Sequence, residues 1–271
     1  MDVLNVLSHG AGVQTSAMVY MVLDGMIEKP DLIVFADPQW ELKETYKYLH
    51  KLMDDVKKAG IPMIIDTIGN IYEDTMNSAT TGERAPSMPF YTEDSIGEEG
   101  IVSRQCTSDY KINVVRQAAR RFLGLKPRQK LKTKIVMWQG ITTDEVERIK
   151  ISHEKMIDYH YPLFDLGLDR LDCMNYLSKN GYGVPPKSSC IGCPFHSRQT
   201  WVDIATNYPD EFKTAVTLDH AIRNHPKFKS QLFLHKSRLP LDIAVQMDSM
   251  QTDLFYDYEG FINDCSGHCG V

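Results

Sequence analysis

The first forty residues constrain the fold of this chain more than any other stretch. An apolar run at 3–7 leads into a loop of small residues at 8–16, a helix-length run follows at 15–26, and a second apolar run at 32–36 ends at Asp37. Apolar runs of strand length that alternate with amphipathic runs of helix length are typical of a parallel sheet joined by helices. The start of the chain therefore predicts an α/β fold.

The loop after the first strand has the composition of an anion-binding turn. Gly10 and Gly12 allow the backbone to approach a ligand, and the helix start adds unpaired N–H groups and the positive end of the helix dipole. Further donors are the hydroxyls of Ser8, Thr15 and Ser16. The loop has neither the Gly-Lys-Ser/Thr of a Walker A motif nor the third glycine of a Rossmann fingerprint. It indicates a phosphate site of another kind, and a plain tight turn is the alternative.

The alternation continues along the chain and predicts a doubly wound, mostly parallel sheet. The further elements expected are strands at 62–68 and 135–138 and helices at 43–59 and 109–122. In such a sheet, ligands bind beyond the carboxyl ends of the strands. The loop at 8–16, Asp37 and Gly140 each follow an expected strand. We therefore expect them to meet at one edge of the sheet.

Residues 69–103 interrupt this rhythm. They are rich in Gly, Ser, Thr, Pro and acidic residues, and a connection of this length is usually functional or disordered. We expect a mobile insertion beside the site, with a plain surface loop as the alternative. The sequence thus predicts a nucleotide-binding core at 1–165 and a smaller helical, cysteine-bearing region at 166–271.

The composition is that of a water-soluble protein, with 42% hydrophobic and 24% charged residues among 271. No apolar run approaches the roughly 18 residues of a membrane span, and Asp2 stands where a signal peptide would be basic. We therefore expect a cytoplasmic location and no membrane partner. In that compartment the six cysteines favour metal binding or redox chemistry over disulfides.

Positive charge is concentrated in one segment although the formal net charge is −6. Residues 110–143 contain no acidic residue and carry a series of lysines and arginines. Such a segment favours phosphate or nucleic-acid binding, and a solvated helix face followed by a basic loop is the alternative. The candidate contacts are Arg104, Lys111, Arg116 and Arg120.

Cys190 and Cys193 form a C-x-x-C pair in a predicted loop. A turn of this kind points two thiolates to one side, where they can hold zinc or an iron–sulfur cluster or act as a redox dithiol. Cys106 precedes the basic helix, and His196 could complete a zinc site. Cys173 lies within a helical pattern and is expected in the core.

The last residues hold two more cysteines, Cys265 and Cys269, with His268 between them. They are candidates for an attacking thiol, for cluster ligands or for metal ligands. A frayed tail with idle thiols is the alternative, because chain ends commonly fray.

Several stretches, taken in order, resemble the pyrophosphate-loop (PP-loop) adenine nucleotide alpha hydrolases, and within them the phosphoadenosine phosphosulfate (PAPS) reductase family. The stretches are 8–16, similar to Ser-Gly-Gly-x-Asp-Ser; 37–46, similar to a strand end with Glu-Phe-Pro-Glu-Thr; 138–148, similar to Gly-Ile-Arg-x-x-Glu-Ser-x-x-Arg; and 161–165 with 190–194, similar to a Pro-Leu turn followed by Gly-Cys-x-x-Cys. Two positions depart from the pattern. Gln14 stands at the family's Asp and Thr142 at its Arg, which leaves open whether ATP is cleaved.

The resemblance implies a site for ATP, or alternatively for PAPS or adenylyl sulfate, with Mg²⁺ if ATP is cleaved. The implied nucleotide contacts are Ser8, Gly10, Gly12, Gln14, Thr15, Ser16, Asp37, Gly140, Glu145 and Arg148. It also implies a [4Fe–4S] cluster on Cys106, Cys190 and Cys193, with zinc as the alternative. The tail loosely resembles the segment that carries the nucleophilic cysteine of PAPS reductases.

Three functions follow from the resemblance. The first is ATP-dependent adenylation and sulfur transfer to a nucleic acid or nucleotide, as in tRNA thiolases and DNA phosphorothioation proteins, with a sulfur-donor protein as partner. The second is a PAPS or adenylyl-sulfate reductase that works with thioredoxin. The third is a non-catalytic nucleotide- or metal-binding subunit. The candidate catalytic residues are Asp37, Cys265 and Cys269.

Overall fold

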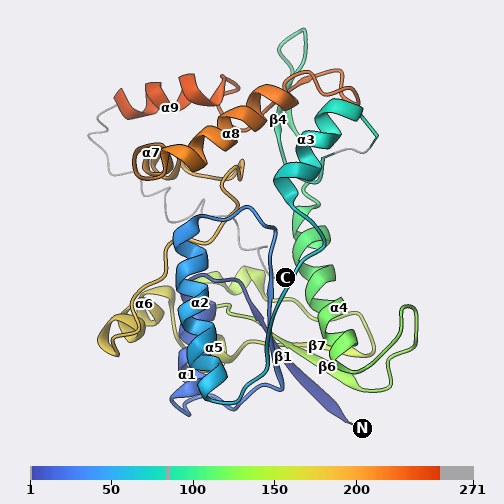
Figure 1. Ribbon diagram of the computed structural model, residues 1–271, viewed down its shortest axis with the longest axis vertical. Coiled ribbons are helices and arrows are strands. Elements are labelled where there is room, and N and C mark those ends of the chain that lie inside the picture. Colours follow the sequence, from blue (N-terminus) through green and yellow to red (C-terminus); the bar gives the residue numbers. More distant parts are fainter. Residues whose placement is uncertain (1, 84–85, 251–271) are drawn as a thin grey trace.

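A five-stranded parallel sheet forms the lower half of the molecule (Figure 1). The computed structural model describes residues 2–83 and 86–250. The sheet has the order β3-β2-β1-β6-β7. Its strands are β1 (Val3–His9), β2 (Leu32–Ala36), β3 (Met63–Asp66), β6 (Lys134–Trp138) and β7 (Ile157–His160). β1 pairs in parallel with both β2 and β6. The predicted doubly wound sheet is confirmed, and β7 is an additional strand.

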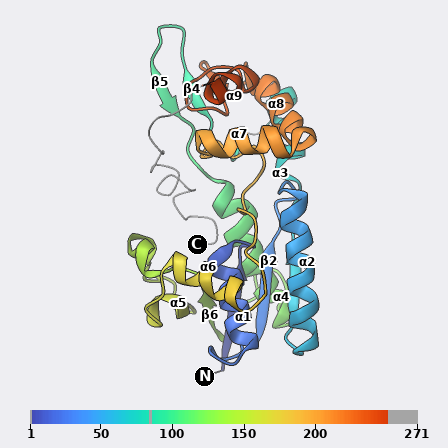
Figure 2. The same ribbon diagram turned by 90° about the vertical axis from the view of Figure 1, so that its left-hand side faces the viewer.

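Helices cover both faces of this sheet (Figures 1 and 2). The covering helices are α1 (Val13–Leu23), α2 (Lys43–Lys58), α4 (Asn113–Phe122), α5 (Pro162–Asp165) and α6 (Arg170–Lys179). Along β1, Leu4 and Val6 pack with the α4 layer, whereas Leu7 packs with the α1 layer. Successive strand residues point to opposite faces. Because both faces are buried, the central strands read as continuous apolar runs.

The upper half has its own core and is mostly helical (Figure 1). It contains α3 (Ile71–Thr81), α7 (Arg198–Asn207), α8 (Pro209–Ile222), α9 (Leu241–Met250) and an antiparallel sheet of β5 (Glu99–Ile101), β4 (Tyr91–Glu93) and β8 (Gln231–Phe233). Trp201, Phe90 and Leu218 are fully buried in one cluster. The helical character expected after residue 165 is present, and the small sheet is an addition to it.

The segment expected as an insertion contributes to this upper core. α3 begins after Asn70, whose side chain accepts the N–H groups of Tyr72 and Glu73, and it ends at Gly82, which has a φ of +64°. β4 pairs with β8, and α3 packs against α8. The segment thus contains regular elements that the sequence reading did not anticipate. Its mobility and the domain division at residue 165 stay predictions.

The two halves meet at the carboxyl edge of the parallel sheet. Trp40 and Leu42, which follow β2, are buried in the upper core. A π-helical turn, η1 (Ser108–Ile112), leads directly into α4, so the expected helix at 109–122 is confirmed. A second short helix, η2 (Thr143–Arg148), follows β6. Among the helices of the described residues, none is both long and apolar enough to cross a bilayer.

Candidate functional site

The loop after β1 leaves the N-terminus of α1 open. The helix begins at Val13, two residues earlier than the sequence indicates, and among the described residues no side chain caps it at Gly12. The N–H groups of Val13, Gln14 and Thr15 therefore have no intrahelical partner, whereas the Ser16 N–H donates to the Gly12 carbonyl at 3.0 Å. A Cβ added at Gly12 would meet no described atom within 4 Å. This open, uncapped turn is suited to an anion.

Hydrogen bonds within the loop fix its shape. The Gly10 N–H donates to Thr15 Oγ1 at 3.2 Å, and that hydroxyl donates to the Gly12 carbonyl at 3.3 Å. Between them Ala11 has a φ of +55°, a left-handed conformation that is uncommon outside glycine and often found at functional sites. Ser16 is fully buried beneath the loop. The Thr15 hydroxyl therefore shapes the loop, whereas the Ser16 hydroxyl has no hydrogen-bond partner among the described residues.

Gly140 lies directly against this loop. A Cβ at Gly140 would be 2.7 Å from Thr15 Cγ2 and 3.1 Å from the Thr15 nitrogen. Both distances are shorter than ordinary van der Waals contact, so only glycine fits between β6 and the start of α1. The structure thus brings Gly140 and Thr15, two of the predicted nucleotide contacts, together.

Gln14 joins the loop to two other segments. Its Nε2 donates to Glu145 Oε2 at 3.3 Å, and its Oε1 accepts a hydrogen bond from Arg170 at 3.3 Å. Arg148 pairs with the same Glu145 oxygen at 2.6 Å. Two guanidinium groups therefore lie beside the loop together with two carboxylates, those of Glu145 and of Asp144, which accepts the Arg170 backbone N–H at 3.2 Å. The sequence reading missed Arg170, and no local motif distinguishes it.

Asp37 holds the turn after β2. Its Oδ1 accepts hydrogen bonds from the Gln39 N–H and from the Tyr46 hydroxyl, both at 2.7 Å. Gln39 has a left-handed φ of +59°. Burial, followed by the hydrogen bond to Asp37, raises the pKa of Tyr46 above its ordinary value. One oxygen of Asp37 therefore has a structural role at this edge.

A small pocket opens beside Ser8, between the strand ends and the start of α4. Gln139 lines this pocket, is 5% exposed, and its Oε1 has no hydrogen-bond partner among the described residues. A buried amide oxygen without a partner is costly unless a water or ligand donates to it. Arg116 lines the same pocket and pairs with Glu154 at 2.7 Å. The pocket therefore brings together Ser8, a predicted phosphate contact, and Arg116, a predicted basic contact.

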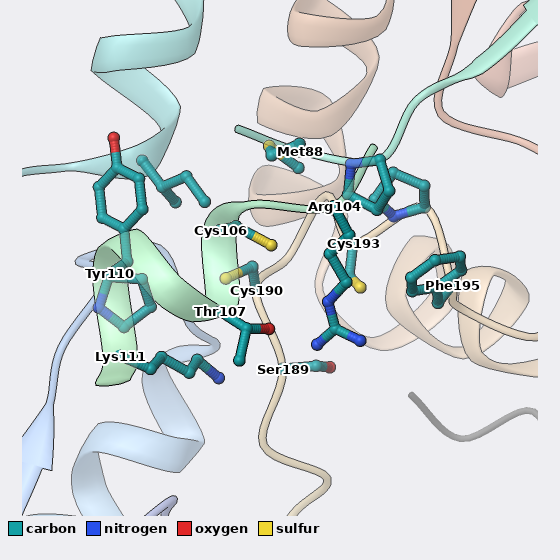
Figure 3. Close-up of a pocket in the computed structure, with 14 residues that line it drawn as sticks. Met88, Arg104, Cys106, Thr107, Tyr110, Lys111, Ser189, Cys190, Cys193 and Phe195 are labelled. Carbon is teal, nitrogen blue, oxygen red and sulfur yellow. The ribbon is translucent and has the colours of Figure 1, made fainter. Parts of the chain in front are cut away.

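The cysteines predicted as metal ligands line one pocket between the two halves (Figure 3). Cys106 comes from the helical turn directly before η1, and Cys190 and Cys193 come from the loop before α7. Pro38, the residue after Asp37, lines the pocket too. Thr107, also in its wall, is 8% exposed, and its hydroxyl has no partner among the described residues. The pocket therefore adjoins the carboxyl edge of β2.

Trp40 supports the cysteine loop. The Ile191 N–H donates to the Trp40 carbonyl at 2.8 Å, and the indole N–H donates to Thr214 Oγ1 at 3.1 Å. A Cβ at Gly192 would lie 2.1 Å from Trp40 Cη2. The glycine between the two cysteines is therefore required by packing against the segment that follows β2.

His196, considered above as a zinc ligand, is hydrogen-bonded to the backbone of the cysteine loop through one ring nitrogen. Its Nε2 lies 3.1 Å from the carbonyl oxygens of both Cys190 and Ile191. Carbonyls only accept, so Nε2 carries the proton, and Nδ1 is the ring nitrogen that keeps a lone pair. Burial lowers the pKa of His196 to about 3, which keeps the ring neutral. A zinc site that includes His196 would have to use Nδ1, and it stays a prediction.

Within residues 2–83 and 86–250, no three His, Cys, Asp or Glu side chains lie close enough to hold one metal ion. The cluster expected on Cys106, Cys190 and Cys193, and zinc as its alternative, therefore stay predictions. Cys173 is fully buried between α1 and α6, as expected, and burial raises its pKa to about 12.

The predicted basic contacts lie in different places. Arg104 lies 5.5 Å from the ring centre of Phe195 beside the cysteine pocket, which Lys111 also lines. Arg116 lines the pocket beside Ser8, and Arg120 donates to the Gln129 carbonyl in the loop after α4. The tail residues Cys265, His268 and Cys269 lie outside the described residues.

Comparison with known proteins gives general similarity only. No protein-family model and no curated protein matches the chain. The chain is similar to PAPS reductase from Candida auris in its phosphate complex, with 13% identity over 68% of this chain and 74% of that one and a TM-score of 0.38. It is also similar to the U34-tRNA thiolase NcsA from Methanococcus maripaludis with its [4Fe–4S] cluster, with 9% identity over 81% and 71% and a TM-score of 0.36. At these TM-scores the fold class rests on the sheet of this chain itself.

Proposed function

We propose that this chain is an enzyme that binds an adenine nucleotide at the α1 loop and performs sulfur chemistry at the cysteine pocket. The observation that carries this proposal is the position of that pocket. It is lined by Pro38, at the carboxyl edge of the sheet, and by all three cysteines. A nucleotide at this edge and a sulfur species at the thiols would therefore be neighbours.

The nucleotide phosphates are proposed to bind the first turn of α1. The uncapped N–H groups there supply donors, and the open space above Gly12 admits the phosphate oxygens. Arg148 and Arg170, linked through Glu145 and Gln14, contribute positive charge. These features favour a phosphate ligand over an empty structural turn.

The reaction proposed first is adenylation followed by thiolation. A carbonyl-like or phosphate oxygen of the acceptor bonds to the α-phosphorus of ATP, the bond to the bridging β-phosphate oxygen breaks, and pyrophosphate leaves. Hydrosulfide from a donor then bonds to the activated carbon or phosphorus, AMP leaves with the former acceptor oxygen, and the hydrosulfide proton is lost to a base. No net electron transfer is needed, and Mg²⁺ would accompany the ATP.

Cys106, Cys190 and Cys193 are the residues that would hold an iron–sulfur cluster. When bound, such a cluster supplies Lewis-acid binding of a soft sulfur ligand. The role of the protein here is to fix the loops. Trp40 supports the C-x-x-C turn, and the neutral ring of His196 donates to its carbonyls.

A sulfonucleotide reductase is the second candidate, and the first turn of α1 favours it. That turn contains no acidic residue, and Gln14 is held by Arg170 and Glu145, so the loop itself offers no carboxylate to a Mg²⁺ ion. In a reductase a cysteine thiolate, Cys265 or Cys269, bonds to the sulfur of PAPS or adenylyl sulfate. The sulfur–oxygen bond breaks and the nucleotide leaves. A dithiol such as thioredoxin then releases sulfite and becomes a disulfide.

The test compares the parent chain with Gly12→Val and Gly12→Ala. Both variants should fold, because a Cβ at Gly12 meets no described atom. A rise in melting temperature with ATP, PAPS or adenylyl sulfate is expected for the parent, a smaller rise for Gly12→Ala, and none for Gly12→Val. Equal rises in all three proteins would refute the assignment. Pyrophosphate release would favour thiolation and sulfite release the reductase, whereas binding with neither product would favour the non-catalytic subunit.

A further inference from the structure

The loop between α4 and β6 concentrates positive charge that forms no ion pairs with the described residues. Its exposed cations are Lys126, Arg128, Lys130 and Lys132. Other cations of the same segment are paired, in Arg116–Glu154, Arg121–Asp66 and Lys134–Asp158. Among the described residues, none of the four loop cations has an ion-pair partner. We refer to these four residues as the basic loop.

The basic loop is held in a defined turn. Arg120 donates to the Gln129 carbonyl, and the Lys126 N–H donates to Gln129 Oε1 at 3.0 Å. Arg128 has a left-handed φ of +63°, a conformation that costs of order 1 kcal/mol outside glycine. These hydrogen bonds fix the backbone around Lys126 and Arg128, and the other two lysines of the basic loop follow within a few residues. A polyanion would relieve the mutual repulsion of these cations.

The basic loop lies at the opposite edge of the sheet from the candidate site. The helix formed by η1 and α4 starts at the site, since Lys111 lines the cysteine pocket and Ile112 lines the pocket beside Ser8. It then runs along the sheet toward the edge where the N-terminus lies (Figure 1). Residues 108–122 correspond to about 20 Å of helix. A mononucleotide bound at α1 would not extend to the basic loop.

We infer that the basic loop docks the phosphate backbone of a nucleic acid whose acceptor atom reaches the candidate site. Double-stranded nucleic acid carries one charge per roughly 1.7 Å of axis, so about 20 Å presents about a dozen phosphates. Lys111 and Arg116 lie at the site end of the same helix, and the basic loop lies at the other. An anionic membrane that bound this loop would contact the end of the helix that lies far from the candidate site. The inference rests on the proposed function, because it names the class of sulfur acceptor.

The test measures binding of fluorescein-labelled duplexes of about 20 base pairs, one of DNA and one of RNA, by anisotropy over a range of salt concentrations. The loop variant replaces Lys126, Arg128, Lys130 and Lys132 with Gln. A matched control replaces four exposed lysines elsewhere, Lys29, Lys57, Lys179 and Lys229, with Gln. Both variants change the net charge equally.

The loop variant should lose at least about tenfold in affinity near 0.1 M salt. In a plot of log K against the logarithm of the salt concentration, the magnitude of its slope should be smaller than that of the parent by about 3 to 4, as expected for the loss of four phosphate contacts. The control should change by less than about threefold. Equal losses in both variants, or none in the loop variant, would overturn the inference. Loop-dependent binding to anionic phospholipid vesicles with no duplex binding would instead assign the surface to a membrane.

The duplex-binding test can succeed or fail independently of the nucleotide-binding test of the proposed function. The loop variant should keep the full nucleotide-induced rise in melting temperature, because its changes lie at the far edge of the sheet. Duplex binding without any nucleotide response would refute the proposed function and leave the docking surface. A nucleotide response without duplex binding would refute the docking surface alone.

Discussion

Gly192 lies against the indole ring of Trp40 so closely that a Cβ at this position would sit 2.1 Å from Trp40 Cη2. Trp40 follows β2 at the sheet edge, and Gly192 stands between the two cysteines of the C-x-x-C pair. This contact joins the proposed nucleotide edge to the cysteine pocket. The conformation of the C-x-x-C loop therefore depends on that of the segment that follows β2.

Replacing Gly192 with alanine should therefore displace the cysteine loop. We expect a loss of about 1–3 kcal/mol in the free energy of unfolding, which is typical of overpacking, together with lower metal content. Urea denaturation and metal analysis measure the two effects. Trp40→Leu removes the clashing ring, so Gly192→Ala should cost less in that background. Strictly additive effects of the two substitutions would contradict the proposed contact.

Replacing Gly140 with alanine should weaken nucleotide binding with a smaller effect on stability. The new methyl would push against Thr15 Cγ2 at 2.7 Å and distort the start of α1. Thr15→Ser removes that methyl and keeps the hydroxyl that fixes the loop, so the double variant should recover part of the binding. Thermal shifts with ATP and PAPS report this. Unchanged binding in Gly140→Ala would argue against the loop as the nucleotide site.

Arg170 should contribute to nucleotide affinity although no sequence motif marks it. It donates to Gln14 and adds positive charge beside the loop. Arg170→Gln should weaken binding by about tenfold, the loss of one charge-assisted hydrogen bond. Arg170→Lys keeps the charge and should weaken binding less. Isothermal titration with the nucleotide that binds the parent measures both, and equal affinities in all three proteins would exclude a role for Arg170.

Stability should fall on mild acidification because burial lowers the pKa of four histidines among the described residues, His9, His196, His225 and His235. Burial lowers the pKa of His9 to about 4 and that of His196 to about 3, from an ordinary value of 6.5. The unfolded chain therefore binds protons below pH 6.5 that the folded chain does not. Stability is highest above this pH and declines down to the folded pKa values. At pH 5 the loss should be about 2 kcal/mol each for His9 and His196.

Urea denaturation at pH 8 and pH 5 tests this dependence, with His196→Gln compared against His50→Gln, whose ring is exposed. His196→Gln should remove part of the decline, whereas His50→Gln should leave it unchanged. A decline of the same size in His196→Gln would show that other groups cause it.

The alternation of apolar and amphipathic runs was sufficient to predict the sheet and the edge that brings Gly140 to Thr15. The Gly, Ser and Pro content of the segment at 69–103 favours a loop, although Asn70 and Gly82 are recognisable helix caps of α3. Arg170 and the contact of Trp40 with Gly192 depend on long-range packing that no local pattern encodes. The basic segment was predicted as one patch. It is divided because α4 runs across the sheet and carries its two ends to opposite edges.

The most direct test of the central claim is the iron and acid-labile sulfide content of anaerobically purified protein. We predict about four of each per chain, as for a [4Fe–4S] cluster. The content should be lost in Cys106→Ser and Cys190→Ser and kept in Cys173→Ala, which alters only a core cysteine. Stoichiometric zinc without iron, or iron that survives in both serine variants, would contradict the account.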